Sequence, residues 1–136
     1  MSQSNAAIAD LSSLLKGMKP VLTPEVYVFA TVSPDVADAL PAKPIMRFEE
    51  GEGTTLLLLE SDAESAGIEH EFACQKITLH VHSALEAVGF MAAISNKLKE
   101  VGVPANVVAG YYHDHLFIPL DKVETALAAL KELAAG

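Results

Sequence analysis

Residues 76–90 read K-I-T-L-H-V-H-S-A-L-E-A-V-G-F, and this stretch decides the fold. Apolar and polar side chains alternate up to His82, which is typical of a strand that buries one face. Ser83 then stands three residues before Glu86, at the head of a long apolar segment, with the spacing of a capping box. The sequence therefore predicts that a strand ends at His82 and that a helix begins directly after Ser83.

A long helix is expected next, because apolar residues recur at helical spacing from Ala84 to Val101. Gly102 is suited to a left-handed cap at its end. Residues 106–112 and 115–119 then predict a hairpin.

The last predicted element is a helix with Asp121 as its cap and Glu124 in its first turn. From Lys76 onward, the expected order is therefore strand, helix, strand, strand, helix. This is the α+β pattern of a ferredoxin-like βαββαβ module that lacks its last strand. The missing strand must come from elsewhere or be left out.

The first half of the chain repeats this order loosely. Its predicted elements are a helix over residues 5–17 with Asn5 as its cap, a strand over 26–32, a helical turn over 35–40, strands over 45–50 and 54–59, and a helical stub over 62–67. We therefore expect two fused modules with antiparallel sheets, residues 1–71 and 72–136. We expect them to lend each other an edge strand, with residues 26–32 or their neighbour filling the gap in the second module.

Composition narrows the class of protein. The chain has 136 residues, enough for two small modules that share a core. Its formal charge of −9 has the wrong sign for binding the phosphate backbone of a nucleic acid. We therefore expect no nucleic-acid partner. Hydrophobic residues make up 51% of the chain, a high share for a small monomer, so we expect a homodimer or a higher homo-oligomer.

Cysteine content and segment lengths bear on the compartment. Cys74 is the only cysteine, so the chain cannot form an internal disulfide, which agrees with a reducing compartment. The first residues have no basic start and no long apolar core, and no later run is long and apolar enough to cross a bilayer. We therefore expect a cytoplasmic protein with no membrane partner.

The junction after His82 is the candidate functional site. A helix N-terminus leaves backbone N–H groups without intrahelical partners and carries a partial positive charge. Such an end can hold a carboxylate or a phosphate without a basic side chain. In the plainer interpretation Ser83 only caps the helix, and both interpretations stay open because a cap and a ligand can share the same amides.

Two segments give the chain a family resemblance. They are H-V-H-S-A-L-E-A-V-G-F at residues 80–90 and N-V-V-A-G-Y-Y-H-D-H-L-F-I-P at residues 106–119. With the predicted order of elements, they resemble the ACT-domain superfamily, and more closely a bacterial group of small stand-alone tandem ACT-like proteins of unassigned activity. The resemblance covers residues 72–133 best, and in the first half it rests on R-F-E-E-G-E-G-T-T-L-L-L at residues 47–58.

ACT domains are regulatory βαββαβ modules that bind amino acids or similar small ligands where the first strand meets the first helix, and they pair side by side into continuous sheets. The resemblance implies a non-enzymatic regulatory module with no cofactor and no catalytic residue. The ligand contacts that it implies are Ser83, Ala84, Leu85, Glu86, Ala87 and Val88, with Asn106 and Val107 on the adjacent strand. Ser83 and Ala84 stand where many ACT domains carry a glycine.

Two His-x-His pairs give the main alternative. His80 and His82 lie on the predicted strand, and His113 and His115 flank a turn at Asp114. Alternate strand residues face the same way, so each pair could chelate a metal, and a small metal-binding protein or metal-dependent enzyme is the second hypothesis. In the structural interpretation, the histidines span a sheet face or an interface and bond to the backbone or to Asp114.

Other reactive groups have plainer interpretations. Glu49, Glu50 and Glu52 could form an acid–base pair, but an acidic hairpin is usually a solvated sheet edge. Cys74 has no neighbouring base in the sequence, and we expect it to be a small buried residue. The sequence contains no P-loop, no Rossmann glycine pattern and no H-E-x-x-H motif.

Overall fold

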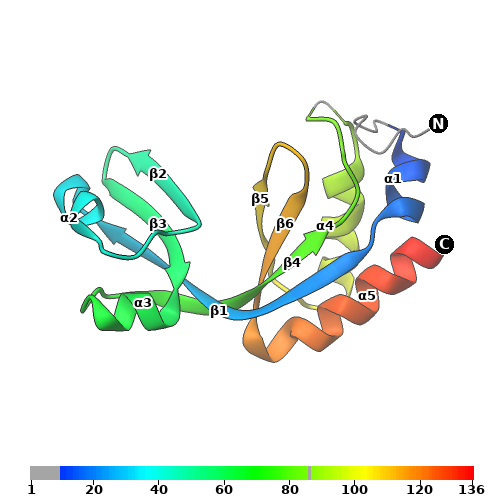
Figure 1. Ribbon diagram of the computed structural model, residues 1–136. Helices are drawn as coiled ribbons and strands as arrows, with labels where there is room; N and C mark the ends of the chain where they lie inside the picture. The colour runs from blue at the N-terminus through cyan, green and yellow to red at the C-terminus, as the bar shows by residue number, and fades with distance from the viewer. Residues whose placement is uncertain (1–9, 86) are drawn as a thin grey trace. The chain divides into compact units, whose positions relative to one another are not determined.

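Figure 1 shows the computed structural model, which describes residues 10–85 and 87–136. The elements in chain order are α1 (Leu11–Gly17), β1 (Pro20–Val32), α2 (Pro34–Ala39), β2 (Met46–Glu50), β3 (Gly53–Leu59), α3 (Glu60–Ser65), β4 (Glu71–Leu79), α4 (Phe90–Glu100), β5 (Asn106–Ala109), β6 (Asp114–Pro119), the 3₁₀ helix η1 (Leu120–Lys122) and α5 (Val123–Ala135). The chain divides into two compact units. The small unit is Pro24–Cys74, and the large unit is the chain up to Thr23 together with Gln75–Gly136.

The small unit is a βαββαβ module. Its strands follow the order β2-β3-β1-β4, to which β1 and β4 contribute the residues between Pro24 and Cys74. β3 pairs antiparallel with both β1 and β2, and a turn at Gly51 and Glu52 joins β2 to β3. This is the α+β module that the sequence predicts.

One face of the small unit's sheet carries its core. Alternate residues of β1 and β3 point to this face, as the two-residue period of a strand requires. The buried side chains are Val28, Ala30, Leu56 and Leu58 from the strands, Ala37 from α2 and Ala63 from α3. Because both helices meet the sheet through alanine, their backbones can approach it closely, and the core is small.

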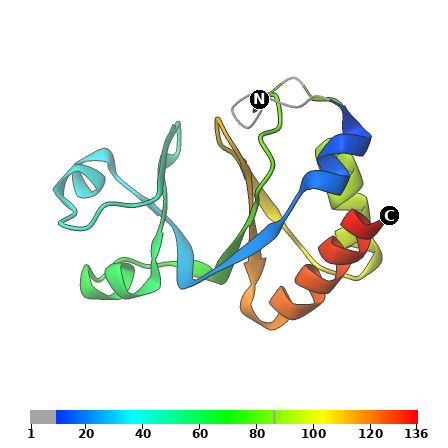
Figure 2. The ribbon, with the colours of Figure 1, turned by 45° about the vertical axis from the view of Figure 1, so that its right-hand side comes forward.

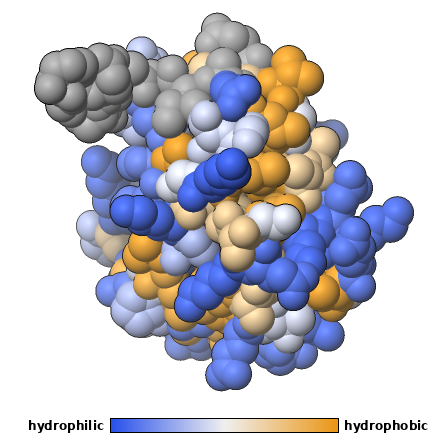
Figure 3. Space-filling model, turned by 90° about the vertical axis from the view of Figure 1, so that its right-hand side faces the viewer, coloured by the Kyte–Doolittle hydropathy of each residue, from blue (hydrophilic) through white to orange (hydrophobic). Residues whose placement is uncertain are grey.

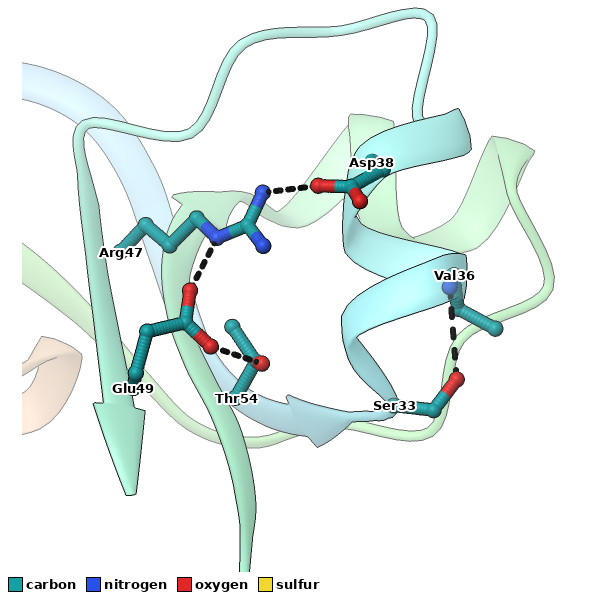
Figure 4. A network of polar contacts seen from close by, with 6 residues as sticks. All are labelled: Ser33, Val36, Asp38, Arg47, Glu49 and Thr54. Atoms are coloured by element: carbon teal, nitrogen blue, oxygen red, sulfur yellow. Dashed lines mark hydrogen bonds and ion pairs between the residues drawn. The ribbon is translucent and has the colours of Figure 1, made fainter. Parts of the chain in front are cut away.

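The start of α2 is closed by the chain's own side chain. Ser33 follows β1 directly, and its Oγ accepts a hydrogen bond from the Val36 N–H at 3.3 Å (Figure 4). Pro34 occupies the first helical turn, where its missing N–H leaves no partner unsatisfied. A single residue, the capping Ser33, therefore connects the strand to the helix.

The acidic hairpin is a solvated edge, as predicted. β2 is the last strand of the small unit, and its residues after Met46 are exposed. Glu49 accepts hydrogen bonds from Thr54 at 2.7 Å and from Arg47 at 2.6 Å, and Arg47 also reaches Asp38 of α2 at 2.7 Å (Figure 4). The Thr54 hydroxyl, followed by Arg47, lowers the pKa of Glu49, so this carboxylate is held ionised in a structural network.

The large unit repeats the βαββαβ order with β4, α4, β5, β6, α5 and the start of β1. Its strands follow the order β1-β4-β6-β5, and β5 pairs antiparallel with β6. Figure 2 shows α1, α4 and α5 together on one side of these strands. The fully buried side chains of this core include Leu14, Ile77, Leu79, Ile94, Leu98, Leu116, Ile118 and Leu130.

The end of α4 is fixed by the predicted glycine. Gly102 has a φ of 72° and donates its N–H to Lys99 O at 3.1 Å, while Val103 N–H donates to Leu98 O at 2.9 Å. These two bonds form a Schellman motif, and Val103 and Leu98 are both buried in the core.

β1 and β4 each contribute residues to both units. β1 starts at Pro20, six residues earlier than predicted, and just before it Lys19 O accepts a hydrogen bond from His80 N–H at 3.1 Å. The start of β1 therefore supplies the last strand of the large unit, and the start of β4 supplies that of the small unit. The expected lending of edge strands is confirmed, and the neighbour of residues 26–32 fills the gap.

The compact units differ from the sequence-based division at residues 71 and 72. The chain up to Thr23 belongs with the large unit because Leu14 and Met18 are buried in that unit's core. α1 begins at Leu11, and Asp10 caps it by accepting a hydrogen bond from Ser13 N–H at 2.9 Å. The predicted cap, Asn5, lies outside the described residues.

Two other helix starts were predicted wrongly. α4 begins at Phe90 and not at Ala84, so Ser83 does not cap it. Asp121 lies inside η1, and Lys122 occupies the cap position of α5. In both places a serine or aspartate ahead of an apolar run gave a capping signal that tertiary packing overrides.

Candidate functional site

Residues 80–89 form the connection from β4 to α4, and Glu86 among them lies outside the described residues. A turn closes within the connection, where Ala87 N–H donates to Ala84 O at 3.0 Å. The connection ends at Gly89, whose φ of 89° favours glycine because it has no Cβ. The site predicted at Ser83 therefore lies in this irregular segment ahead of the helix.

The N-terminus of α4 lacks the serine cap that the sequence predicts. Gly89 occupies the cap position and has no side chain, and no side chain in the described part of the chain makes the cap hydrogen bond. The first intrahelical bond runs from Ala93 N–H to Gly89 O at 2.9 Å. The N–H groups of Phe90, Met91 and Ala92 therefore have no acceptor within the helix, and they lie at its positive end.

Packing fixes the position of this helix end. Phe90 is 2% exposed and lies in the large unit's core together with Ile94 and Leu98, one and two turns further along α4. Leu11 of α1 also approaches, since its Cδ2 lies 3.6 Å from the point where a Cβ on Gly89 would stand. The first turn of α4 is thus packed on the core, with an apolar side chain of α1 beside it.

Ser83 anchors the connection to β6. Its Oγ–H donates a hydrogen bond to Asp114 Oδ2 at 3.0 Å, and Asp114 is only 8% exposed. The hydroxyl satisfies a buried carboxylate at the beginning of β6, where removing it would leave a charged acceptor short of a partner. Sequence reasoning missed this pairing of Ser83 with Asp114, because nothing local to either residue signals a contact across 31 positions of the chain.

The connection presents apolar side chains to solvent. Leu85 is 69% exposed and Val88 is 85% exposed, whereas Ala84 and Ala87 are half-buried. On the face that Figure 3 shows, apolar atoms also lie between polar ones and form no single large patch. Exposed apolar side chains beside free backbone donors are a combination that a small ligand with one charged and one apolar end could use.

The two strand residues implied by the resemblance lie elsewhere. Asn106 and Val107 belong to β5, and β6 stands between β5 and β4, so the expectation that they lie on the strand next to β4 is wrong. They pair with Phe117 and Leu116, whereas Ala109 is the β5 residue that pairs with Asp114. The structure thus brings the connection close to the end of β5 that is farther from Asn106.

The four histidines of the two pairs lie near the same end of the large unit. β4 ends at Leu79, so His80 and His82 follow the strand and do not alternate along it. The rings of His80 and His113 have centroids 4.9 Å apart, and those of His82 and Tyr112 are 5.2 Å apart. Within residues 10–85 and 87–136, no three of these histidine and neighbouring acidic side chains have ligand atoms within 4.8 Å of one another.

The electrostatics of His113 and His115 favour neutral rings. Burial, followed by the nearby His80, lowers the pKa of His113, and burial, followed by Lys76, lowers the pKa of His115. His115 Nδ1 also lies 2.9 Å from Thr78 Oγ1, within hydrogen-bond distance. The structural interpretation expected bonds to the backbone or to Asp114, whereas His115 lies against Thr78 and the Asp114 carboxylate accepts from Ser83.

Cys74 is buried, as expected. Its Sγ–H donates to Tyr27 O at 3.3 Å, and burial raises the pKa of the thiol to about 11. A thiol with a raised pKa is a poor nucleophile, because the thiolate is the reactive form.

No helix in the described ranges is long and apolar enough to cross a membrane.

Comparison with known families gives two adjoining matches. A family model described as an ACT domain matches residues 6–75, and a second model with the same description matches residues 69–132. None of the curated proteins compared with this sequence matches it.

Solved structures share the fold. A Vibrio cholerae protein of unknown function, described as a possible transport protein, is 48% identical, with a TM-score of 0.83, over 91% of this chain and 95% of that one. An Agrobacterium tumefaciens protein is 15% identical, with a TM-score of 0.69, over 86% and 89% of the two chains. A ligand-free regulatory subunit of aspartate kinase from Thermus thermophilus is 12% identical, with a TM-score of 0.67, over 87% and 98%.

Proposed function

This chain belongs to the ACT-domain family, and from that premise we propose that it is a non-enzymatic regulatory module that binds a small carboxylate-bearing metabolite, most simply an amino acid. The proposed site is the connection between β4 and α4. The observation that carries the proposal is the start of α4 on Gly89, which leaves the first-turn amides without a serine cap. Those amides can hold a carboxylate without help from a basic side chain.

The rest of the connection suits the other end of such a ligand. Leu85 and Val88 are exposed and could cover an apolar side chain, while Ala84 and Ala87 leave room for close approach of the backbone. Ser83 would act through Asp114, by holding the connection in place. Backbone contacts from residues 83–88 remain part of the proposal, whereas Asn106 and Val107 lie at the far end of β5 and are not proposed as contacts.

The relatives support a regulatory ligand-binding role. The fold is that of a regulatory subunit of aspartate kinase, an enzyme named for an amino-acid substrate. ACT domains as a family serve regulation more than catalysis, which supports a role without chemistry of its own. We place the protein in the cytoplasm on the ground that its one cysteine is a free thiol.

We also propose that two copies associate by extending the sheet at β5. β5 is the last strand of the large unit, and Val107 on it is 40% exposed. An exposed edge strand offers unpaired backbone groups to a second strand, and an apolar side chain there gains from being covered.

Thermal unfolding in the presence of each common amino acid tests the ligand proposal. A ligand that binds only the folded state raises the melting temperature, by an amount that corresponds to about 2.7 kcal/mol at a hundredfold excess over Kd. Ala92→Pro removes one first-turn N–H of α4 at a position where proline is tolerated, and should abolish the shift. Thr125→Pro, at the matching position of α5, is the control and should keep it.

Two results would contradict the proposal. If no amino acid or small carboxylate raises the melting temperature, the protein is not such a sensor. If Ala92→Pro responds as strongly as the unmodified protein, the α4 amides are not the binding groups.

The dimer is tested separately by light scattering of Val107→Arg, which should be monomeric because a charge would have to be buried at the β5 edge. An unchanged mass would place the interface elsewhere.

A further inference from the structure

Three metal-ligating side chains meet in the small unit, away from the site proposed above. Within residues 10–85 and 87–136, one group of histidine and acidic residues has ligand atoms that all lie within 4.8 Å of one another, and it consists of Glu60, Glu64 and His70. Glu60 and Glu64 stand one turn apart on α3, and His70 immediately precedes β4. All three belong to the compact unit Pro24–Cys74.

The chain reversal after α3 explains why these residues meet. Gly67, with a φ of 67°, donates its N–H to Glu64 O at 3.1 Å, and Ile68 N–H donates to Ala63 O at 2.9 Å. This is a second Schellman motif, and Ile68 packs against the small unit's core. The turn carries the chain back along α3, which places His70 beside the face that Glu60 and Glu64 share.

One ring nitrogen of His70 is already bonded within the chain. Its Nδ1 lies 2.9 Å from Ile68 O, and a carbonyl oxygen can only accept, so Nδ1 carries the hydrogen. The lone pair of the neutral ring is therefore on Nε2. Metal-ligating histidines usually donate their other ring N–H to a carbonyl or carboxylate in this way, which fixes both the tautomer and the ring orientation.

Within the described ranges, no lysine or arginine forms an ion pair with Glu60 or Glu64. The ion pairs there use Arg47 and Lys97. Two carboxylates this close repel each other, and a dication between them would offset the repulsion. We propose that Glu60, Glu64 and His70 bind one divalent transition-metal cation, with Zn²⁺ as the best match.

The ligand set decides between cations. Zn²⁺ readily takes one imidazole and two carboxylates, and water can occupy its fourth position. Mg²⁺ and Ca²⁺ prefer ligand sets made of oxygen alone, so an imidazole counts against them. The bound ion would tie α3 to the beginning of β4, and it would stabilise the small unit independently of any ligand at α4.

Calorimetric titration of the chelator-treated full chain with zinc chloride tests the proposal. One Zn²⁺ should bind per chain, and Mg²⁺ at the same concentrations should not compete. Glu64→Gln and His70→Gln should each raise the Kd by at least about tenfold, because each removes a direct ligand and loss of a supporting partner alone costs that much. Glu69→Gln removes the same charge next to His70, outside the cluster, and should leave the Kd unchanged.

A second variant separates this site from the histidines of the large unit. His80→Gln combined with His113→Gln should keep the zinc affinity. The proposal is overturned if Glu64→Gln and His70→Gln bind like the unmodified chain, if Glu69→Gln weakens binding equally, or if only the His80 and His113 variant loses it. Circular dichroism of each metal-free variant checks that the fold is kept, which is expected because these side chains lie outside both cores.

Discussion

The same connection is built in two ways in the two units. In the small unit, β1 passes into α2 through Ser33 alone, and the serine hydroxyl closes the helix start (Figure 4). In the large unit, β4 passes into α4 through residues 80–89, and the helix starts on a glycine that has no side chain to offer. Both connections join the first strand of a βαββαβ module to its first helix.

This difference separates a structural helix start from one that is available to a ligand. Where Ser33 accepts the Val36 N–H, one amide is already satisfied and the tight turn leaves little room. Where ten residues, 80–89, intervene, no side chain in the described ranges caps the helix start, and the first-turn amides have no acceptor within the helix. The proposed binding site therefore belongs to the module that departs from the compact pattern.

The largest expected effect compares the two cores. β3 and β6 are the third strands of their modules. Leu56 on β3 and Leu116 on β6 are both fully buried. Each change to alanine should cost about 2–5 kcal/mol of unfolding free energy, with Leu116→Ala nearer the upper end because its larger core relaxes less around a cavity. Urea unfolding measures both. A larger loss for Leu56→Ala would reverse our ranking of the two cores.

Glycine at the start of α4 gives the next largest effect. Gly89→Ala forces a side chain into a left-handed backbone conformation and should cost about 1–2 kcal/mol. Gly67→Ala, at a φ of 67° in the small unit, is the matched control and should cost about the same. Only Gly89→Ala should weaken the melting-temperature response to the ligand. Equal responses in the two variants would count against the site at α4.

The capped helix start should matter for stability alone. Ser33→Ala removes the acceptor of the Val36 N–H and should lower the unfolding free energy by about 1 kcal/mol. Ligand response should be unchanged, because α2 carries no part of the proposed site. Urea unfolding and the amino-acid thermal-shift series check the two halves of this prediction, and a changed ligand response would contradict it.

Acid should weaken the large unit slightly. The pKa values of His113 and His115 are lowered in the folded chain, first by burial, so the unfolded chain binds protons more readily. Stability is therefore fully present above the unfolded pKa of about 6.5 and falls as the pH drops below it. His113→Gln should flatten this dependence in urea unfolding measured from about pH 7.5 to about pH 5.5. A dependence as steep as before would show that other groups cause it.

The order of elements could be predicted from the sequence, because each strand and helix carries its own period. The alternation before Ser83 and the glycine stop at Gly102 are local signals, and the structure confirms the strand and the stop, although β4 ends at Leu79 and not at His82 as predicted. The sharing of edge strands was also foreseen, since the C-terminal module is one strand short. Its donor could not be placed at Pro20, because Pro24 inside β1 resembles the end of a loop.

The start of α4 could not be predicted for a different reason. Ser83 and Glu86 have capping-box spacing, and Leu85 and Val88 continue the apolar run, but both apolar side chains turn out to be exposed. Hydrophobic periodicity reports which residues could be buried and not which ones are. The burial of Phe90 and the contact between Ser83 and Asp114 decide the outcome, and both depend on elements distant in the chain.

β1 and β4 also govern how this protein can be divided. A fragment that stops at residue 71 would lose the strand that completes the small unit, and a fragment that starts at residue 72 would lose the start of β1 and, with α1, part of the large core. Each half expressed alone would expose an apolar sheet edge and tend to aggregate. The two modules can therefore be moved or fused to another protein only as a pair.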